Sequence, residues 1–293
     1  MHATVSCLKA YTTWECADGI EECRKACGGH GYLRVSGLPD IFARYVPSCT
    51  FEGDNYVLIQ QTARYQLKCL KQFKLHPLTN FGIDFDYILH SDRWLHEKCG
   101  VIDPMVWLDI RAQVDVLKHR AIRLVVELSD HLSHLISSGR SESEAWNLAQ
   151  PLFIRTTRAH AYLMLTRNFY GNAEKIEDKN IRTVMIKLQQ LFTLTHIEKH
   201  LADFLEDGFM TGMHGNQIRA VQSQLLLELR PNIVALVDAF NIPDSKMYYS
   251  ALGRYDGQVY KALFESTARD ARNQTDVTPA YDAHLKSLLK SNL

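Results

Sequence analysis

The stretch IRLVVELSDHLSHLISSGRSESE (residues 122–144) decides the fold class of this chain. The apolar residues of its first half recur every three or four positions, as they do on one face of an α-helix. They are Ile122, Val125, Leu128, Leu132 and Leu135. Gly139 is suited to end that helix, and SESE (residues 141–144) has the pattern of a capping box that opens the next one. The stretch therefore predicts two consecutive helices.

Similar signals predict helices along the rest of the chain. Helices are expected over residues 3–26, 40–45, 54–73, 184–204 and 217–240, with a kink or a new start at Pro151 and an interruption at Pro231. No segment shows the sustained period-two alternation of a half-buried strand. The sequence therefore predicts an all-α protein.

Residues 74–105 have weak periodicity, and we interpret them as a connector between two packed helical units. The predicted domains are residues 1–73, the connector at 74–105, and residues 106–293. A chain of 293 residues is long enough to bury a substantial core.

The composition excludes several functional classes. Lysine plus arginine and aspartate plus glutamate number 33 each, so no net charge favours nucleic acid or an anionic membrane as a partner. No apolar run reaches the roughly 20 residues that span a bilayer. The N-terminal residues also lack the charged start and apolar middle of a secretory signal.

All seven cysteines lie within the first 99 residues of the chain, and their number is odd. This pattern favours free thiols in a reducing compartment over a disulfide framework. Cys23, Cys27 and His30 could suggest a zinc site, but no second ligand pair accompanies them. We therefore predict no metal site.

The glycines of CGGHGY (residues 27–32) follow an expected helix. A dinucleotide fingerprint needs a different spacing between a strand and a helix. Gly28, Gly29 and Gly31 are best explained by a helix stop and a tight turn. Closely spaced glycines also let a backbone approach a ligand, which remains the alternative.

Glu52 lies between Phe51 and Gly53, directly before a helix that Asp54 or Asn55 can cap. Backbone N–H groups at a helix start stabilise a carboxylate, while an apolar neighbour such as Phe51 would desolvate it. A carboxylate between those two influences suits a general base. The residues alone favour a solvated or capping glutamate and leave the general base as the alternative.

Three longer segments carry a family resemblance. They are GIEECRKACGGHGY (19–32), SGLPDIFARYVPSCTFEGDNYVLIQQTARY (36–65) and LVDAFNIPDSKMYYSALGRYDGQVYKALFE (236–265). They resemble the peroxisomal acyl-CoA oxidases, which are relatives of the acyl-CoA dehydrogenases. The resemblance implies FAD-dependent oxidation of a fatty acyl-CoA to the trans-2-enoyl-CoA in β-oxidation, with O2 reduced to hydrogen peroxide.

The resemblance also implies roles for individual residues. Glu52 would remove the α-proton, its backbone N–H would bind the thioester carbonyl, and Gly53 would allow the substrate to approach closely. Gly28, Gly29, His30 and Gly31 would contact the adenine end of FAD. The family further implies a homodimer.

The chain ends in Ser291-Asn292-Leu293, which is similar to the Ser-Lys-Leu address read by the peroxisomal import receptor, with Asn292 at the basic position. The resemblance and this terminus together indicate the peroxisome.

In the family, an N-terminal helical domain and a central β-domain precede the region that this chain resembles. The resemblance therefore identifies the chain with the C-terminal helical bundles of an acyl-CoA oxidase, without the β-domain. One alternative is an inactive helical module that binds a full-length oxidase subunit or another partner. Another is a dehydrogenase that passes electrons to a carrier protein instead of O2.

Overall fold

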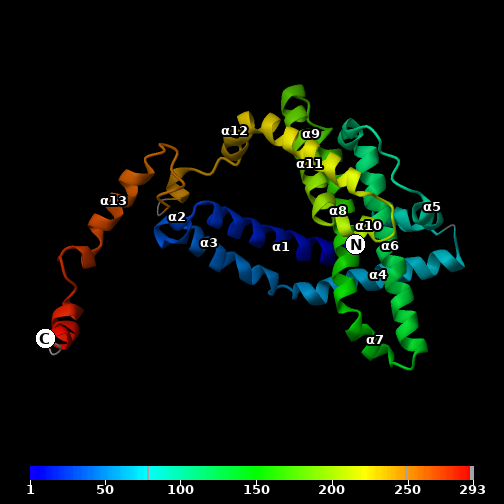
Figure 1. Cartoon of the computed structure of the whole chain (residues 1–293), viewed down its shortest axis with the longest axis horizontal. Coiled ribbons are helices and arrows are strands. Elements are labelled where there is room, and N and C mark those ends of the chain that lie inside the picture. The colour runs from blue at the N-terminus through cyan, green and yellow to red at the C-terminus, as the bar shows by residue number, and fades with distance from the viewer. Residues whose placement is uncertain (78, 248–249, 291–293) are drawn as a thin grey trace. The chain divides into compact units, whose positions relative to one another are not determined.

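The computed structural model of the chain describes residues 1–77, 79–247 and 250–290. Every regular element among these residues is a helix (Figure 1), so the predicted all-α fold class is confirmed. The α-helices are α1 (His2–Ala26), α2 (Gly29–Tyr32), α3 (Leu38–Tyr45), α4 (Asn55–Leu75), α5 (Ser91–His96), α6 (Ile110–Ser137), α7 (Glu142–Leu148), α8 (Gln150–Ala173), α9 (Lys179–Lys199), α10 (Leu201–Leu205), α11 (Gly212–Leu229), α12 (Ile233–Asp238), α13 (Val259–Arg269) and α14 (Lys286–Lys290). Short 3-10 segments include Arg34–Ser36, Val46–Cys49, Ile83–His90, Pro104–Leu108 and Arg230–Asn232.

The helix ends around residue 140 form as the sequence predicts. α6 stops at Ser137, and Gly139 follows with a left-handed φ of 95°. The Ser141 hydroxyl accepts a hydrogen bond from the Glu144 backbone N–H, and the Glu144 carboxylate accepts one from the Ser141 N–H at 2.9 Å. Pro151 lies in the first turn of α8, so a new helix begins there.

The sequence predicts one helix over residues 184–204, but the structure has two, α9 and α10, with His200 between them. Apolar periodicity continues through this break, so the pattern gives no sign of it. In α10, Asp203 lies 2.7 Å from Arg120 of α6 and 2.7 Å from Arg155 of α8. These ion pairs tie α10 to α6 and α8 and are made only in the folded protein.

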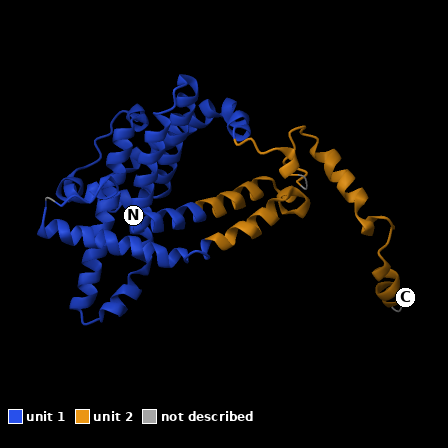
Figure 2. Cartoon of the chain, turned by 180° about the vertical axis from the view of Figure 1, so that it is seen from behind, with its two compact units in different colours: residues 1–14, 49–239 blue, residues 15–48, 240–293 orange. Residues whose placement is uncertain are grey.

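The chain divides into two compact units (Figure 2). Unit 1 contains residues 1–14 and 49–239, and unit 2 contains residues 15–48 and 240–293. The expected connector at 74–105 lies within unit 1 and contributes Phe85, Tyr87 and Trp94 to its core. These units describe packing, and the domain boundaries expected from the sequence stay a prediction.

The core of unit 1 forms where α6 packs on α8, α8 on α9, and α9 on α11. Leu117 and Leu124 of α6, Leu163 of α8 and Ile197 of α9 are fully buried there. Each such side chain contributes about 1.5–3 kcal/mol through removal of its apolar surface from water. In unit 2, the backbone N–H of Ala251 donates to Val35, which ties residues 240–293 to the segment after α2.

Two features that the described residues lack bear on function. None of their helices is both long enough and apolar enough to cross a membrane. Nor do three or more of their histidine, cysteine or acidic side chains gather as they would around a metal ion. The seven cysteines are free thiols.

Candidate functional site

Glu52 lies in a turn between the 3-10 segment Val46–Cys49 and α4, within unit 1. The Asp54 carboxylate caps α4 by accepting a hydrogen bond from the Tyr56 N–H at 2.9 Å. This result confirms one of the two caps expected from the sequence. The cap does not involve Glu52, so the capping explanation for that residue is removed.

The backbone of this turn is unusual. Glu52 has a φ of 57° and Gly53 a φ of 103°, so two consecutive residues have positive φ. Among the described residues other than glycine, Asn241 alone shares this property with Glu52. An L-residue in the left-handed region costs roughly 1–2 kcal/mol. Such strain persists only where surrounding contacts impose it, and it is common at functional sites.

The Glu52 side chain is exposed, and its carboxylate forms no hydrogen bond or ion pair with another described residue. Phe51, which could have desolvated it, is itself 52% exposed. The expectation of an apolar shield from Phe51 is therefore wrong within this chain. Within the described residues, the Glu52 carboxylate is therefore free to accept a hydrogen bond or a proton from a ligand.

Side chains and backbone groups of α1 hold the turn at Glu52 and Gly53 in place. The Lys9 ammonium donates to the Gly53 carbonyl oxygen at 2.6 Å and to the Asn55 side-chain oxygen at 2.9 Å. The Asn55 amide donates to the Ala10 carbonyl at 3.1 Å and to the Thr13 hydroxyl at 2.9 Å. Asn55 is 1% exposed, so these bonds anchor the start of α4 to one face of α1.

The glycine turn lies in unit 2. The Gly28 N–H donates to the Lys25 carbonyl at 2.9 Å and so closes the end of α1, and Gly28 has a φ of 57°. Gly28, Gly29 and His30 are exposed. A β-carbon at Gly28 or Gly29 would meet no atom within 4 Å, so their backbone is accessible to a ligand.

Gly31 differs from the two preceding glycines. It is buried, and a β-carbon there would lie 1.9 Å from the Arg24 carbonyl oxygen. Only glycine allows α2 to pack this closely against the end of α1. Packing alone therefore explains why position 31 is a glycine, independently of the cofactor contact that the resemblance implies.

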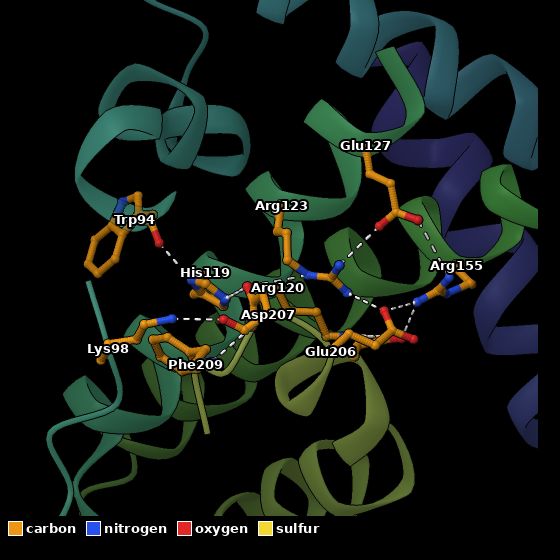
Figure 3. Close-up of polar contacts among 11 residues, drawn as sticks. Trp94, Lys98, His119, Arg120, Arg123, Glu127, Arg155, Glu206, Asp207 and Phe209 are labelled. Carbon is orange, nitrogen blue, oxygen red and sulfur yellow. Dashed lines mark hydrogen bonds and ion pairs between the residues drawn. The ribbon is translucent and has the colours of Figure 1, made fainter. Parts of the chain in front are cut away.

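A cluster of charged side chains, separate from the two turns, lies between α6, α8 and the end of α10 (Figure 3). Arg123 and Arg155 both reach the Glu206 carboxylate, at 3.1 and 2.9 Å. Deeper in the unit, the Arg120 guanidinium is 1% exposed and donates to Asp203 at 2.7 Å. Burial alone would raise the pKa of Asp203, but Arg120 and Arg155 outweigh it and lower that pKa.

In the same region, both ring nitrogens of His119 lie against hydrogen-bond acceptors, the Trp94 carbonyl at 2.6 Å and the Asp207 carboxylate at 2.8 Å (Figure 3). The His119 ring also stacks on Phe209, with ring centres 3.7 Å apart. These side chains bond to one another, and we interpret the cluster as a structural network that ties α10 to α6 and α8.

Comparison with known proteins identifies the family. Residues 109–290 match the family described as acyl-CoA oxidase, and residues 1–67 match the acyl-CoA oxidase C-alpha1 domain. The chain belongs to the acyl-CoA oxidase family. Both the Glu52 turn and the glycine turn lie within the match to the C-alpha1 domain.

Individual acyl-CoA oxidases agree with this assignment. The peroxisomal acyl-coenzyme A oxidase 1 of Rattus norvegicus is 39% identical over 289 residues, which are 98% of this chain and 44% of the rat protein. The structure of Arabidopsis thaliana acyl-CoA oxidase 1 matches with a TM-score of 0.92 and 35% identity. It covers 100% of this chain, which spans 44% of that protein.

A third relative has been solved with ligands. Acyl-CoA oxidase-2 of Caenorhabditis elegans, bound with FAD, ascaroside-CoA and ATP, matches with a TM-score of 0.89 and 30% identity. It covers 99% of this chain, and the match takes in 42% of the worm protein. This chain thus spans less than half the length of the acyl-CoA oxidases that it matches.

The sequence singled out Glu52 and the glycine turn as candidate site residues but gave no indication that Lys9 contacts the Glu52 turn. Its bonds to Gly53 and Asn55 join residues 44 and 46 positions apart, and no local pattern reports such a contact. A weak signal exists in hindsight. Lys9 and Thr13 are four residues apart on α1 and therefore lie on the same face of the helix.

Proposed function

We propose that this chain forms the C-terminal helical part of a FAD-dependent acyl-CoA oxidase and supplies its catalytic base, Glu52. The reaction would convert a fatty acyl-CoA to the trans-2-enoyl-CoA and O2 to hydrogen peroxide. The observation that carries the proposal is the Glu52 turn: a strained glutamate with an unpartnered carboxylate, inside the match to the C-alpha1 domain. The relatives' names support a peroxisomal role, and the family resemblance supports a role in β-oxidation.

The family resemblance supplies the chemistry proposed for the base, and the geometry of the turn is compatible with it. The exposed Glu52 carboxylate would take the α-proton of the acyl-CoA, and its backbone N–H would stabilise the negative charge that develops on the thioester carbonyl. Gly53 has no side chain to obstruct the thioester beside that carboxylate. Exclusion of water in the assembled site would strengthen both interactions.

The glycine turn supports a role in holding FAD. Gly28 and Gly29 leave open space beside their backbone, and His30 is an exposed ring next to them, so these three residues fit a contact with the adenine end. Gly31 would support the turn from beneath and could reach the cofactor only through its backbone. When bound, FAD would accept the hydride from the β-carbon and pass the electrons to O2.

Two partners belong to the same proposal. A homodimer is inferred from the family, and a peroxisomal import receptor from the terminal residues. Ser291, Asn292 and Leu293 lie outside the described residues. Fusing the last dozen residues to a fluorescent reporter tests the second partner. A reporter that stays outside the peroxisomes would exclude this signal.

The central experiment compares the native protein with Glu52→Gln, both supplied with FAD and a fatty acyl-CoA. Flavin absorbance reports cofactor binding, and hydrogen peroxide reports turnover. Glu52→Gln should lower turnover at least about a hundredfold, because removal of a general base costs about that much or more. Flavin content should not change.

Retained turnover in Glu52→Gln would exclude Glu52 as the base. If the native chain neither binds flavin nor releases peroxide, the enzymatic proposal fails for this chain by itself. Turnover that needs a carrier protein and proceeds without O2 would instead identify a dehydrogenase.

A further inference from the structure

We propose that Lys9 is a positioning residue for catalysis: it fixes the Glu52–Gly53 turn by binding the Gly53 carbonyl, an inference that rests on the proposed function of Glu52. The Lys9 ammonium lies 2.6 Å from that oxygen and 2.9 Å from the Asn55 side-chain oxygen. Among the described residues, Lys9 bonds to Gly53 and Asn55 and forms no ion pair with Glu52, so it acts on the backbone of the turn and leaves the carboxylate free.

The turn needs such a contact because its conformation is unfavourable by itself. Glu52 and Gly53 both have positive φ, and a non-glycine residue stays in that region only when neighbouring contacts impose it. A charge-assisted hydrogen bond to the Gly53 carbonyl is well placed to do so, since that carbonyl sets the orientation of the following peptide. Lys9 is half-buried, which shields this bond in part from water.

Lys9 itself stands on a rigid support. Cys7, Ala10 and Tyr11 on the same helix are buried against α4 and α8. The Tyr11 hydroxyl lies 2.9 Å from the Ile154 carbonyl and 2.8 Å from the Thr157 hydroxyl of α8. The first half of α1 is thereby held in place within unit 1, and Lys9 transmits that position to the turn.

Contacts on both sides of the Glu52–Gly53 turn also hold its ends to α1. Asn55 binds Ala10 and Thr13 and so fixes the residue that starts α4. On the other side of the turn, the Cys49 thiol donates to the Thr13 carbonyl at 3.7 Å. Between these two anchors, Lys9 contributes the hydrogen bond to the Gly53 carbonyl.

The test measures hydrogen exchange of the backbone amides that begin α4, in the full chain. The amides of Val57 and Leu58 donate to the Asp54 carbonyl and report opening of this turn. Lys9→Met should accelerate their exchange about fivefold to tenfold, because it removes the charge-assisted hydrogen bonds to Gly53 and Asn55. Lys9→Arg keeps a cationic donor and should restore most of the protection.

Two matched controls accompany these variants. Lys25→Met makes the same change on α1, at an exposed lysine that pairs with Glu22, and should leave the amides of Val57 and Leu58 unaffected. The Ala145 amide, at the start of α7, should exchange equally in all variants. Unchanged exchange of Val57 and Leu58 in Lys9→Met would overturn the proposal.

A kinetic measurement tests the link to catalysis in protein that forms peroxide. Lys9→Met should lower kcat about tenfold with KM nearly unchanged, since a misplaced base affects the chemical step more than substrate binding. Faster exchange with unchanged kcat would reduce Lys9 to a structural residue. Full turnover in Glu52→Gln would refute the proposed function alone, because the exchange experiment still decides whether Lys9 holds the turn.

Discussion

Replacing Glu52 by glycine should stabilise the folded chain. With a φ of 57°, Glu52 pays roughly 1–2 kcal/mol for the left-handed conformation, and glycine adopts that region freely. The gain is reduced by about 0.4–1 kcal/mol, because glycine makes the unfolded chain more flexible. The lost side chain adds no further cost, since its carboxylate has no partner among the described residues. The net gain should be about 0.5–1 kcal/mol.

The assay is urea unfolding followed by helical circular dichroism, with three variants compared. Glu52→Ala keeps an L-residue at the strained position and should leave the free energy of unfolding within about 0.5 kcal/mol of the native value. Gly53→Ala is the reciprocal change. It should destabilise by about 1–3 kcal/mol, because its φ of 103° excludes most side chains and the new β-carbon would lie 3.1 Å from Leu58 Cδ2.

The refuting result is a Glu52→Gly variant that is no more stable than Glu52→Ala. It would mean that the left-handed conformation of Glu52 carries no cost that glycine relieves. The predicted order has a functional meaning. A glutamate retained where glycine would be more stable is expected of a residue kept for its chemistry.

The remaining predictions concern stability and are measured by the same unfolding assay. Asp203→Asn should lower the free energy of unfolding by about 3–5 kcal/mol, because it leaves the buried Arg120 guanidinium without a counter-charge. Arg120→Met should lower it by less, since Asp203 keeps its ion pair with Arg155. Equal losses of stability in the two variants would contradict this prediction. Burial and the nearby Arg167 charge lower the pKa of His160 to about 3, so its unfolded form, with a pKa of about 6.5, binds protons first on acidification. Stability should therefore fall as the pH drops below about 6.5, with about 2 kcal/mol from His160 lost by pH 5. His160→Gln should remove that share, and an unchanged pH dependence would exclude it.

Several helix ends could be predicted because they depend on residues close in sequence. The capping box at Ser141 and Glu144, the stop at Gly139 and the start at Pro151 all rest on side chains within one helical turn. Asp54 belongs to the same class. Such signals depend on local backbone geometry, so they hold regardless of the surrounding packing.

The break at His200 and the core position of residues 74–105 could not be predicted in this way. Apolar periodicity runs unbroken across His200, and the ion pairs of Asp203 reach residues 48 and 83 positions away. The aromatic residues of the 74–105 segment lack helical spacing, yet Tyr87 is fully buried and accepts a hydrogen bond from the Gln66 side chain. Contacts between segments far apart in the sequence decide such features, and a pattern of neighbouring residues carries no information about those contacts.

The sequence by itself determined the all-α fold and the acyl-CoA oxidase family, and it singled out Glu52 as the leading candidate for a site residue. Family motifs and helix signals each lie within a short run of neighbouring residues, so the sequence is enough to identify them. Only the tertiary structure decided that Glu52 adopts a strained backbone, that Gly31 packs beneath its turn, and that Lys9 reaches Gly53. The Gly31 contact forms where α2 folds back on the end of α1, and the Lys9 contact forms only once the first half of α1 lies against the turn that precedes α4.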